Sequence, residues 1–484
     1  MKNLNRIIVI ILAIFSCQLN AIELGTVKSY VVFDTSDDFS EYSSGDIITD
    51  SQGNVYQAFT RTYIDSGDSV NKVIIIKYLS NGNVDLSFGN AGELNIGTTT
   101  NNNNTYVLEI GKLNDGTETL LFGYSQIICP TPDIADCHSD IKIINLSVAG
   151  IELGSIDIPF NEGSTYLRQD DDFTDLTFIW SLNKVAITAE IERSDEFDTD
   201  FGVAMLTLNP VTGELNMDTS FGIDNDGKTQ CYFDQGGASG KFDRPESVVY
   251  DFSSNSIIVG GTAFEGNGLS SQGTNMAFCN FSMDGSVLLP KWTTQDGVIS
   301  HSVEKVYDMK IAVEGIGNTV IYVTGTANGS DLTSDVVLLK YHKPNTNWII
   351  DSSFGSNNGW NTVGFTINSE NTSDEGRKLF LENDGSILIA GTSKFTTFKR
   401  KINLVKYRKD GSLYKSWGSR TVYPKGTNVI QLDSTQYQYC NVLGMTEDVS
   451  KGIIYIVGNQ IDTPDTLAYM AKLHNDMIFG NTFE

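Results

Sequence analysis

A short apolar strand pattern recurs along this chain at near-equal spacing and always ends at an equivalent position. Successive ends are 65, 65, 72, 64, 66 and 67 residues apart. Such a period predicts one supersecondary unit copied along the chain, with each copy burying the face that its neighbour exposes. The pattern constrains the architecture and indicates no chemistry. The recurring ends are Phe59, Tyr124, Ala189, Gly261, Gly325, Gly391 and Gly458.

The sixth copy shows the content of one unit most clearly. Strand-like segments at 377–382, 386–392 and 402–408 are rich in Ile, Leu, Val and Tyr, which favours β-structure. Turns rich in Asp and Gly separate them, because Asp-Gly tolerates the positive φ of tight hairpins. The segment after Asp410-Gly411 leads towards a fourth strand. Each unit is therefore expected to be a four-stranded antiparallel sheet.

An aromatic residue, usually followed by Gly, comes after the third strand in most copies. One large aromatic side chain per sheet is typical of a packing anchor between neighbouring sheets, rather than of a ligand contact. The anchors are Phe88, Phe221, Trp292, Phe354 and Trp417.

Seven copies of four strands predict a seven-bladed β-propeller, because radial closure protects sheet edges. The last copy runs through a third strand at 467–473 and leaves no room for a fourth. An additional strand at 26–34 precedes the first full copy. These two defects are complementary, so the N-terminal strand is expected to complete the last blade. Residues 22–484 are then one domain.

Three segments, at 83–97, 383–393 and 404–413, carry the sequences NVDLSFGNAGELNIG, NDGSILIAGTS and LVKYRKDGSL. In this order of motifs the chain resembles bacterial proteins with delta-60 repeats. The resemblance covers nearly all of residues 22–484, although the second and third copies depart from the pattern. It implies an exported, propeller-like protein, and it implies no catalytic residues.

Residues 1–21 are expected to be a signal peptide. Lys2 and Arg6 precede an apolar run at 7–15 that is shorter than the roughly 20 residues of a membrane span. Cleavage is expected after Ala21, with lipidation of Cys17 as the alternative. The protein is therefore expected in the periplasm, on the cell surface or outside the cell. No later segment is long and apolar enough to be a transmembrane helix.

The chain is strongly acidic. It has 33 Lys and Arg and 60 Asp and Glu residues, a net charge of −27, and loss of Lys2 and Arg6 would bring this to −29. Binding to nucleic acid needs clustered basic residues, so the charge argues against that class of partner. We expect a monomer.

Five cysteines follow the signal segment. Cys129 and Cys137 flank a short loop with two prolines, and an exported chain meets oxidising conditions, so we expect them to form a disulfide. Cys231 and Cys279 could pair, but the sequence does not decide this. Cys440 is then expected to be a buried thiol.

Two acidic groups are candidate calcium ligands, because Ca²⁺ prefers several carboxylate and carbonyl oxygens. The alternative for both is a solvated acidic loop. No other cofactor and no catalytic motif is indicated, since the four His are scattered and neither a GxSxG nor a phosphate-binding loop occurs. The candidates are Asp170, Asp171, Asp172 with nearby Asp175, and Asp224 with Asp226.

The connections between strands fall into two classes. Those from the first to the second strand and from the third to the fourth are short, and the others are long, which we call the short-turn face and the long-loop face. Insertions gathered on one face of a repeat protein typically mark a binding face. Long connections include 98–104, 129–137, 161–175, 194–200, 265–273 and 394–401.

Three functions remain open at this stage. The leading one is a non-enzymatic protein that binds a protein or glycan partner through the long-loop face. The first alternative is a hydrolase or lyase with a carboxylate-lined site at the central channel, because propellers assemble sites from several blades without a linear motif. The second is a structural component of the cell surface. Ionisable residues that converge at the channel would favour the enzyme.

Overall fold

A computed structural model describes the chain from residue 29 to residue 474 with several gaps. All regular elements in the described residues are β-strands. The predicted signal peptide and the loop with Cys129 and Cys137 lie outside them. The described residues are 29–33, 41–65, 68–99, 105–128, 138–160, 170–192, 198–233, 241–264, 273–294, 303–315, 317–328, 333–367, 370–396, 399–418, 426–430, 439–462 and 465–474.

The strands form antiparallel sheets whose members mostly follow one another along the chain. The first sheets are β2 to β5 (Glu41–Thr49, Val55–Asp65, Asp68–Tyr78, Glu93–Thr99), β6 to β9 (Tyr106–Lys112, Glu118–Ile128, His138–Ser147, Glu152–Ile158) and β10 to β14 (Asp171–Ile179, Lys184–Glu192, Asp198–Leu208, Leu215–Met217, Lys228–Cys231). Next come β15 to β18 (Lys241–Asp251, Ser256–Phe264, Thr274–Ser282, Val287–Thr293) and β19 to β23 (Glu304–Glu314, Asn318–Asn328, Ser334–His342, Ile349–Ile350, Trp360–Val363).

A small hairpin, β24 and β25 (Thr366–Ile367, Glu370–Asn371), leads to the last sheets. These comprise β26 to β29 (Ser373–Leu381, Ile387–Thr396, Lys399–Tyr407, Thr427–Ile430), β30 to β33 (Tyr439–Cys440, Gly444–Asp448, Ile453–Asp462, Asp465–His474) and β1 (Ser29–Phe33). Parallel pairings of β12 with β15 and of β28 with β30 join neighbouring sheets.

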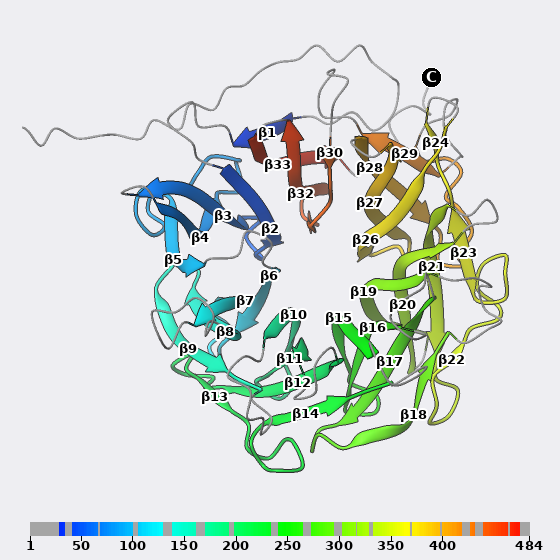
Figure 1. The fold of residues 1–484 in the computed structure, drawn as a ribbon, viewed down its shortest axis with the longest axis horizontal. Helices are drawn as coiled ribbons and strands as arrows, with labels where there is room; N and C mark the ends of the chain where they lie inside the picture. Colours follow the sequence, from blue (N-terminus) through cyan, green and yellow to red (C-terminus); the bar gives the residue numbers. More distant parts are fainter. Residues whose placement is uncertain are drawn as a thin grey trace, which may run out of the picture.

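The sheets are arranged radially about a central axis, with β2, β6, β10, β15, β19 and β26 innermost (Figure 1). Each of these strands contacts the next one around the ring, and β31 contacts both β26 and β2, so the ring is closed. β1 pairs with β33 in antiparallel register, from Ser29 opposite Lys472 to Phe33 opposite Ala468. This pairing of the N-terminal strand with the last strand confirms the prediction made from the two chain ends.

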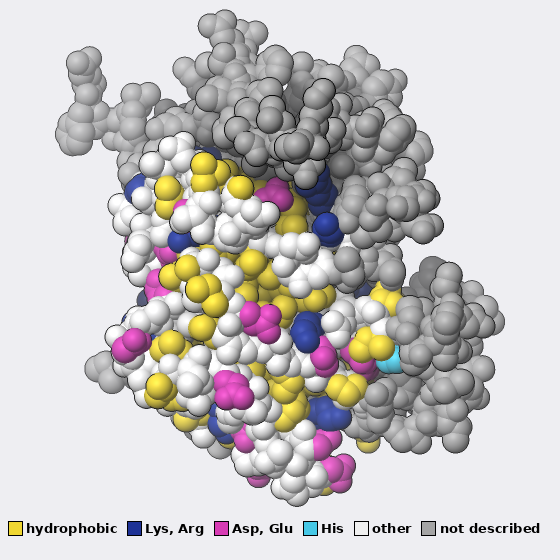
Figure 2. Space-filling model, turned by 90° about the vertical axis from the view of Figure 1, so that its left-hand side faces the viewer, with side chains coloured by type: hydrophobic (Ala, Val, Ile, Leu, Met, Phe, Trp, Pro, Cys, Tyr) yellow, Lys and Arg dark blue, Asp and Glu magenta, His cyan; other side chains and the backbone are white. Residues whose placement is uncertain are grey.

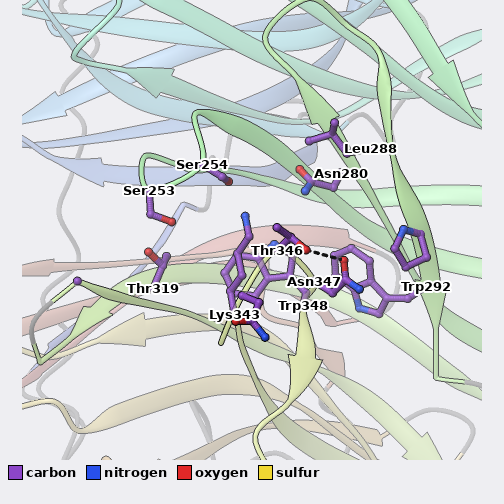
Figure 3. Close-up of a pocket in the computed structure, with 13 residues that line it drawn as sticks. Ser253, Ser254, Asn280, Leu288, Trp292, Thr319, Lys343, Thr346, Asn347 and Trp348 are labelled. Carbon is purple, nitrogen blue, oxygen red and sulfur yellow. Dashed lines mark hydrogen bonds between the residues drawn. The ribbon is translucent and has the colours of Figure 1, made fainter.

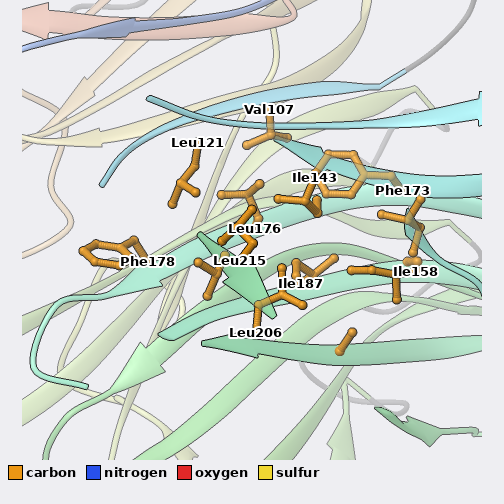
Figure 4. Close-up of a cluster of buried hydrophobic side chains, with 14 of the residues drawn as sticks. Val107, Leu121, Ile143, Ile158, Phe173, Leu176, Phe178, Ile187, Leu206 and Leu215 are labelled. Atoms are coloured by element: carbon orange, nitrogen blue, oxygen red, sulfur yellow. The ribbon is translucent and has the colours of Figure 1, made fainter. Parts of the chain in front are cut away.

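The hydrophobic core lies between neighbouring sheets. In Figure 4, Val107 and Leu121 of one sheet pack against Phe173, Leu176 and Ile187 of the next. Further clusters of the same kind fill the spaces between the other sheets. Because both faces of a sheet are covered in this way, its strands are apolar in long runs rather than in strict alternation.

Aspartates at one repeated position connect the innermost strands. Each accepts a hydrogen bond from a backbone N–H of the next innermost strand, and we call this contact an axial tie. Ser247 makes the equivalent contact with the N–H of Met309, at 3.3 Å. The aspartate ties are Asp46 with Leu108 at 3.0 Å, Asp175 with Val248 at 2.9 Å and Asp308 with Leu379 at 2.8 Å.

The outer strand differs from the prediction. Of the predicted aromatic anchors, Trp292 is only partly buried, whereas Phe88, Phe221, Phe354 and Trp417 are buried. The Gly222 and Gly355 N–H groups that follow two of them donate to the turn carbonyls of Asp284 and Asp410 in the neighbouring sheet. Because the anchor segment turns away to reach that neighbour, it splits the expected fourth strand, as between β13 and β14 and between β22 and β23.

The anchor can be tested at Phe354, which is 2% exposed and packs edge-to-face against Tyr322 at 5.8 Å between ring centroids. Phe354→Ala is expected to lower the free energy of unfolding by about 3 to 5 kcal/mol, as for other buried phenylalanines. Urea denaturation followed by tryptophan fluorescence measures this loss. Phe252, which is 51% exposed, is the matched control, and Phe252→Ala should change little. Equal effects of the two substitutions would contradict the anchor role.

Candidate functional site

The described residues enclose a cavity of about 470 Å³ on the axis, which we call the axial cavity. Innermost strands of all the sheets around the ring contribute to its wall. The wall begins at the aspartates of the axial ties, near the middle of these strands. It extends to Trp180 and Tyr250, which lie next to the turns after β10 and β15. The cavity therefore extends towards the short-turn face. Its ionisable side chains are Asp46, Glu109, Asp175, Glu246, Tyr250, Tyr307, Asp308, Lys310 and Lys378.

β-Bulges help to place some of these side chains. The register of β15 against β16 shifts between Pro245 and Ser247, and that of β19 against β20 shifts between Val306 and Asp308. The extra residues, Glu246 and Tyr307, leave the regular ladder and line the cavity. Bulges commonly redirect a side chain next to a functional site. Sequence reasoning missed these residues because a bulge depends on the register between two strands.

Lys310 is the central cation of the axial cavity. Its Nζ lies 3.2 Å from a carboxylate oxygen of Asp308. Burial alone would lower the pKa of Lys310, but the carboxylates of Asp308, Asp175 and Glu109 outweigh it and raise the pKa above its ordinary value. Protein surrounds the side chain, yet 48% of it is exposed, because the cavity is open. Solvent therefore screens the charges within the cavity from one another.

Two carboxyl groups near Lys310 have raised pKa values. Burial raises the pKa of Glu109 to about 7, although the charge of Lys310 opposes the shift. Burial also raises the pKa of Asp175 to about 6, against the opposing charges of Lys310 and Lys378. A carboxyl group that titrates near neutral pH can accept or donate a proton during a reaction.

A second ionic group lies at the bulges. The Arg244 guanidinium is 3.0 Å from a carboxylate oxygen of Glu246. Burial raises the pKa of Glu246, although Arg244 and Arg377 oppose this shift. The Arg377 guanidinium lies 3.9 Å from the ring centroid of Tyr307 and 2.6 Å from Glu375. Each arginine therefore has a carboxylate neighbour, and the bulge region presents paired charges to the axis.

The aspartates of the first predicted calcium group accept hydrogen bonds from several different residues. Asp170 and Asp172 each accept a hydrogen bond from Ser139. Asp171 is buried and accepts a 2.7 Å hydrogen bond from the Phe160 N–H. The Asp175 carboxylate forms the axial tie to Val248.

The second predicted group lies in a turn where Asn225 has a φ of 54° and Gly227 a φ of 85°. Asp226 accepts from the Lys228 N–H at 3.0 Å and lies 3.4 Å from the Lys228 ammonium. Across the described part of the chain, no three His, Cys, Asp or Glu side chains are grouped so that they could hold a metal ion.

Asp171 belongs to a second repeated contact, which we call a clasp. An aspartate near the start of an innermost strand accepts a hydrogen bond from the N–H of a phenylalanine 9 to 11 residues earlier. The clasp ties together the two ends of a long-loop connection. The repeated Phe and Asp in the sequence could have revealed it. The pairs are Phe160 with Asp171 at 2.7 Å, Phe233 with Asp243 at 2.6 Å and Phe365 with Asp374 at 2.8 Å.

The cysteine pairing left open by the sequence is resolved within the described residues. Cys231 of β14 and Cys279 of β17 form a disulfide between two neighbouring sheets, with Cα atoms 6.6 Å apart. Cys440 is buried, as predicted. The predicted pairing of Cys129 with Cys137 falls outside the described residues.

The charges on one face of the molecule and the helix content of the described residues bear on contacts with a charged partner or a membrane. Figure 2 shows the side of the ring that carries β3, β4 and β5, where acidic and basic side chains are scattered among polar and apolar ones. Within the described ranges, the chain has no helix of the length and hydrophobicity needed to cross a bilayer.

No protein-family model matches this chain, and a comparison with curated proteins finds no match. Among solved structures it is similar to the β-propeller domain of the Trilobed protease from Pyrococcus furiosus, with 11% identity, a TM-score of 0.39, and coverage of 91% of this chain and 98% of that chain. It is also similar to the periplasmic gluconolactonase of Pseudomonas aeruginosa, with 11% identity, a TM-score of 0.37, and coverage of 74% and 80%. A third is the acylaminoacyl peptidase of Pyrococcus horikoshii, with 10% identity, a TM-score of 0.39, and coverage of 92% and 54%. The all-β ring described above is a β-propeller fold.

The leading expectation, a non-enzymatic protein that binds a partner through the long-loop face, is corrected. Ionisable side chains converge in the axial cavity, which is the arrangement that favours the enzyme alternative. The long connections that motivated the earlier expectation fall largely outside the described residues.

The clasps predict how stability changes with pH. Burial raises the pKa of Asp171 to about 8 and that of Asp374 to about 7. Between about pH 4 and pH 8 the folded state therefore binds more protons than the unfolded state, and stability falls as pH rises. The melting temperature should be higher at pH 5 than at pH 8. Asp171→Asn keeps an acceptor for Phe160, cannot ionise, and should flatten this slope in differential scanning calorimetry.

Asp284 provides the control for this test. Hydrogen bonds from Ser282 and Ser286 lower the pKa of its exposed carboxyl to about 2. Its protonation therefore changes only below about pH 4, and Asp284→Asn should leave the slope between pH 5 and pH 8 unchanged. The clasp account fails if Asp171→Asn and the unsubstituted protein have the same slope.

Proposed function

We propose that the protein is a hydrolase or lyase whose site is the axial cavity. The observation that carries this proposal is that Glu109, Asp175 and Lys310 converge on the wall of one cavity, where burial raises the pKa of both carboxyl groups. Perturbed titratable groups that share a cavity with a fixed charge are typical of catalytic sites.

Glu109 is the preferred proton-transfer group. Asp46, Asp175 and Asp308 each commit a carboxylate oxygen to an axial tie, which fixes their position and reduces their freedom to act. Glu109 lies on β6, where the pairing with β7 has no bulge, at the position that corresponds to Lys310 on β19. A carboxyl with a pKa near 7 can protonate a leaving group or remove a substrate proton at neutral pH.

Lys310 would stabilise negative charge that develops on the substrate in either reaction. An ammonium group that is already in position does this without costly reorganisation. The apolar part of the substrate would lie against Phe178 and Trp180, whose rings are in edge-to-face contact at 5.1 Å on the wall of the cavity. A substrate with an apolar face and a polar or acidic reacting group fits both features.

The finer architecture belongs to the same proposal. We infer seven blades in one domain over residues 22–484, with β1 completing the last blade through its pairing with β33. The delta-60 resemblance, a signal peptide at 1–21, export, the Cys129–Cys137 disulfide, a monomeric state and calcium binding at Asp170 to Asp172 or at Asp224 and Asp226 remain predictions.

The activity can be sought with nitrophenyl glycosides and esters, aldonolactones, and acidic polysaccharides whose cleavage by a lyase creates an absorbing double bond. We expect turnover of at least one class, with a pH profile that reports an ionisation near pH 7. Glu109→Gln should lower kcat by about 100-fold or more, which is the usual range for loss of a general acid or base. Steady-state kinetics of the full chain measure both effects.

The matched control is the exposed Glu152 on β9, outside the cavity wall. Glu152→Gln should leave the rate unchanged, and circular dichroism should show that both variants are folded. Absence of turnover across all substrate classes, or equal activity of Glu109→Gln and the unsubstituted protein, would contradict the proposed site.

A further inference from the structure

A second cavity of about 480 Å³ lies on the short-turn face, between the sheet of β15 to β18 and the sheet of β19 to β23 (Figure 3). We call it the Trp groove, and it shares no lining residue with the axial cavity. One wall carries Asn280 and Trp292, and the opposite wall carries Thr319 and Trp348. A cavity of this size falls within the range of small-ligand sites.

The connection between β21 and β22, residues 343–348, builds one wall of the groove. Lys343 and Trp348 of this connection line the groove.

The single lysine in the groove is already neutralised. Its Nζ lies 3.2 Å from an Asp251 oxygen, and the two side chains are 10% and 0% exposed. The hydroxyls of Ser253 and Ser254 donate to the same carboxylate. The remaining side chains of the wall are uncharged. An anionic ligand would therefore find no free positive charge, and the chemistry of the groove favours a neutral ligand.

Four side chains of the groove each carry a buried polar atom without a hydrogen-bond partner in the described part of the protein. These atoms are Asn280 Oδ1, Thr319 Oγ1 and the Nε1 atoms of Trp292 and Trp348. Asn280, Thr319 and Trp348 are only 6%, 3% and 7% exposed. Buried polar groups are nearly always paired, and an unpaired one is costly. One acceptor, one hydroxyl and two donors match a ligand that carries several hydroxyl groups.

The groove also offers a rigid aromatic surface. Trp292 stacks on Phe278 with ring centroids 5.2 Å apart and an interplanar angle of 13°, which fixes the orientation of the indole. Leu288 extends this apolar side of the groove. Sugar rings have an apolar C–H face and a rim of hydroxyls, so they need an aromatic surface together with neutral hydrogen-bonding groups. We propose that the Trp groove binds a neutral saccharide of one or two rings.

Calorimetric titration of the full chain tests this proposal with maltose, cellobiose, lactose and diacetylchitobiose, and with inorganic phosphate as an anionic probe. We expect at least one disaccharide to bind and phosphate not to bind. Trp348→Phe keeps a ring and removes the N–H, and Asn280→Ala removes the acceptor, so each should weaken binding at least tenfold. Trp180→Phe, in the axial cavity, should leave the affinity unchanged.

Binding of phosphate alone, binding of no disaccharide, or a disaccharide affinity that both groove variants leave unchanged would overturn the proposal. A stability measurement provides a second test. Thr319→Val keeps the shape of the side chain, and loss of an unpaired hydroxyl should leave the melting temperature unchanged or raise it. A clear fall would mean that the hydroxyl has a partner within the protein and would count against the saccharide site. Neither result depends on activity in the axial cavity.

Discussion

The axial tie is the contact on which the arrangement of the axis depends. A sheet that contributes to a closed ring must place its innermost strand against two neighbours, and the strand edge at the axis has no ladder partner. The carboxylate of Asp175 or Asp308 supplies an acceptor to a backbone N–H of the next strand at 2.8 to 2.9 Å. The apolar clusters hold the faces of neighbouring sheets together, and the axial ties hold their innermost strands together.

The same repeated position brings charge to the axis. Carboxylates occupy it in β2, β10 and β19, whereas β26 has Lys378 there. The cavity therefore combines acids that hold the ring together with Lys310 and Lys378, which partly neutralise them. Glu109 takes part in none of the axial ties described above. Burial raises its pKa to about 7. Structural acids thus create the electrostatic setting in which one further acid can act.

Much of the fold follows from local sequence. Alternating Asp-Gly turns and apolar segments predict the strands, and the Ser-Phe-Gly anchors predict the packing between sheets at Phe88, Phe221 and Phe354. The pairing of β1 with β33 follows from a missing strand at one end of the chain and an extra one at the other. These features can be predicted from the sequence because each depends on a few neighbouring residues or on the number of strands in each copy of the repeat.

The axial cavity depends on properties that the linear sequence does not display. Glu246 and Tyr307 reach the axis through bulges, which are set by the register between strands. Asp171 and Asp172 look like one acidic cluster in the sequence, yet neighbouring residues of a strand point to opposite faces. In the structure, Asp171 accepts a hydrogen bond from the Phe160 N–H, and Asp172 accepts one from the Ser139 hydroxyl. The two carboxylates therefore have different hydrogen-bond partners.

The ring holds Glu109 in an environment that raises its pKa to about 7. The direct measurement is a pH titration by NMR of the protein labelled with ¹³C at the glutamate carboxyl carbon, with the resonance assigned by its loss in Glu109→Gln. The account predicts one glutamate that titrates near pH 7 and disappears in the variant. If every glutamate titrates near the ordinary value of about 4.3, the axial cavity does not perturb Glu109 and the account is wrong.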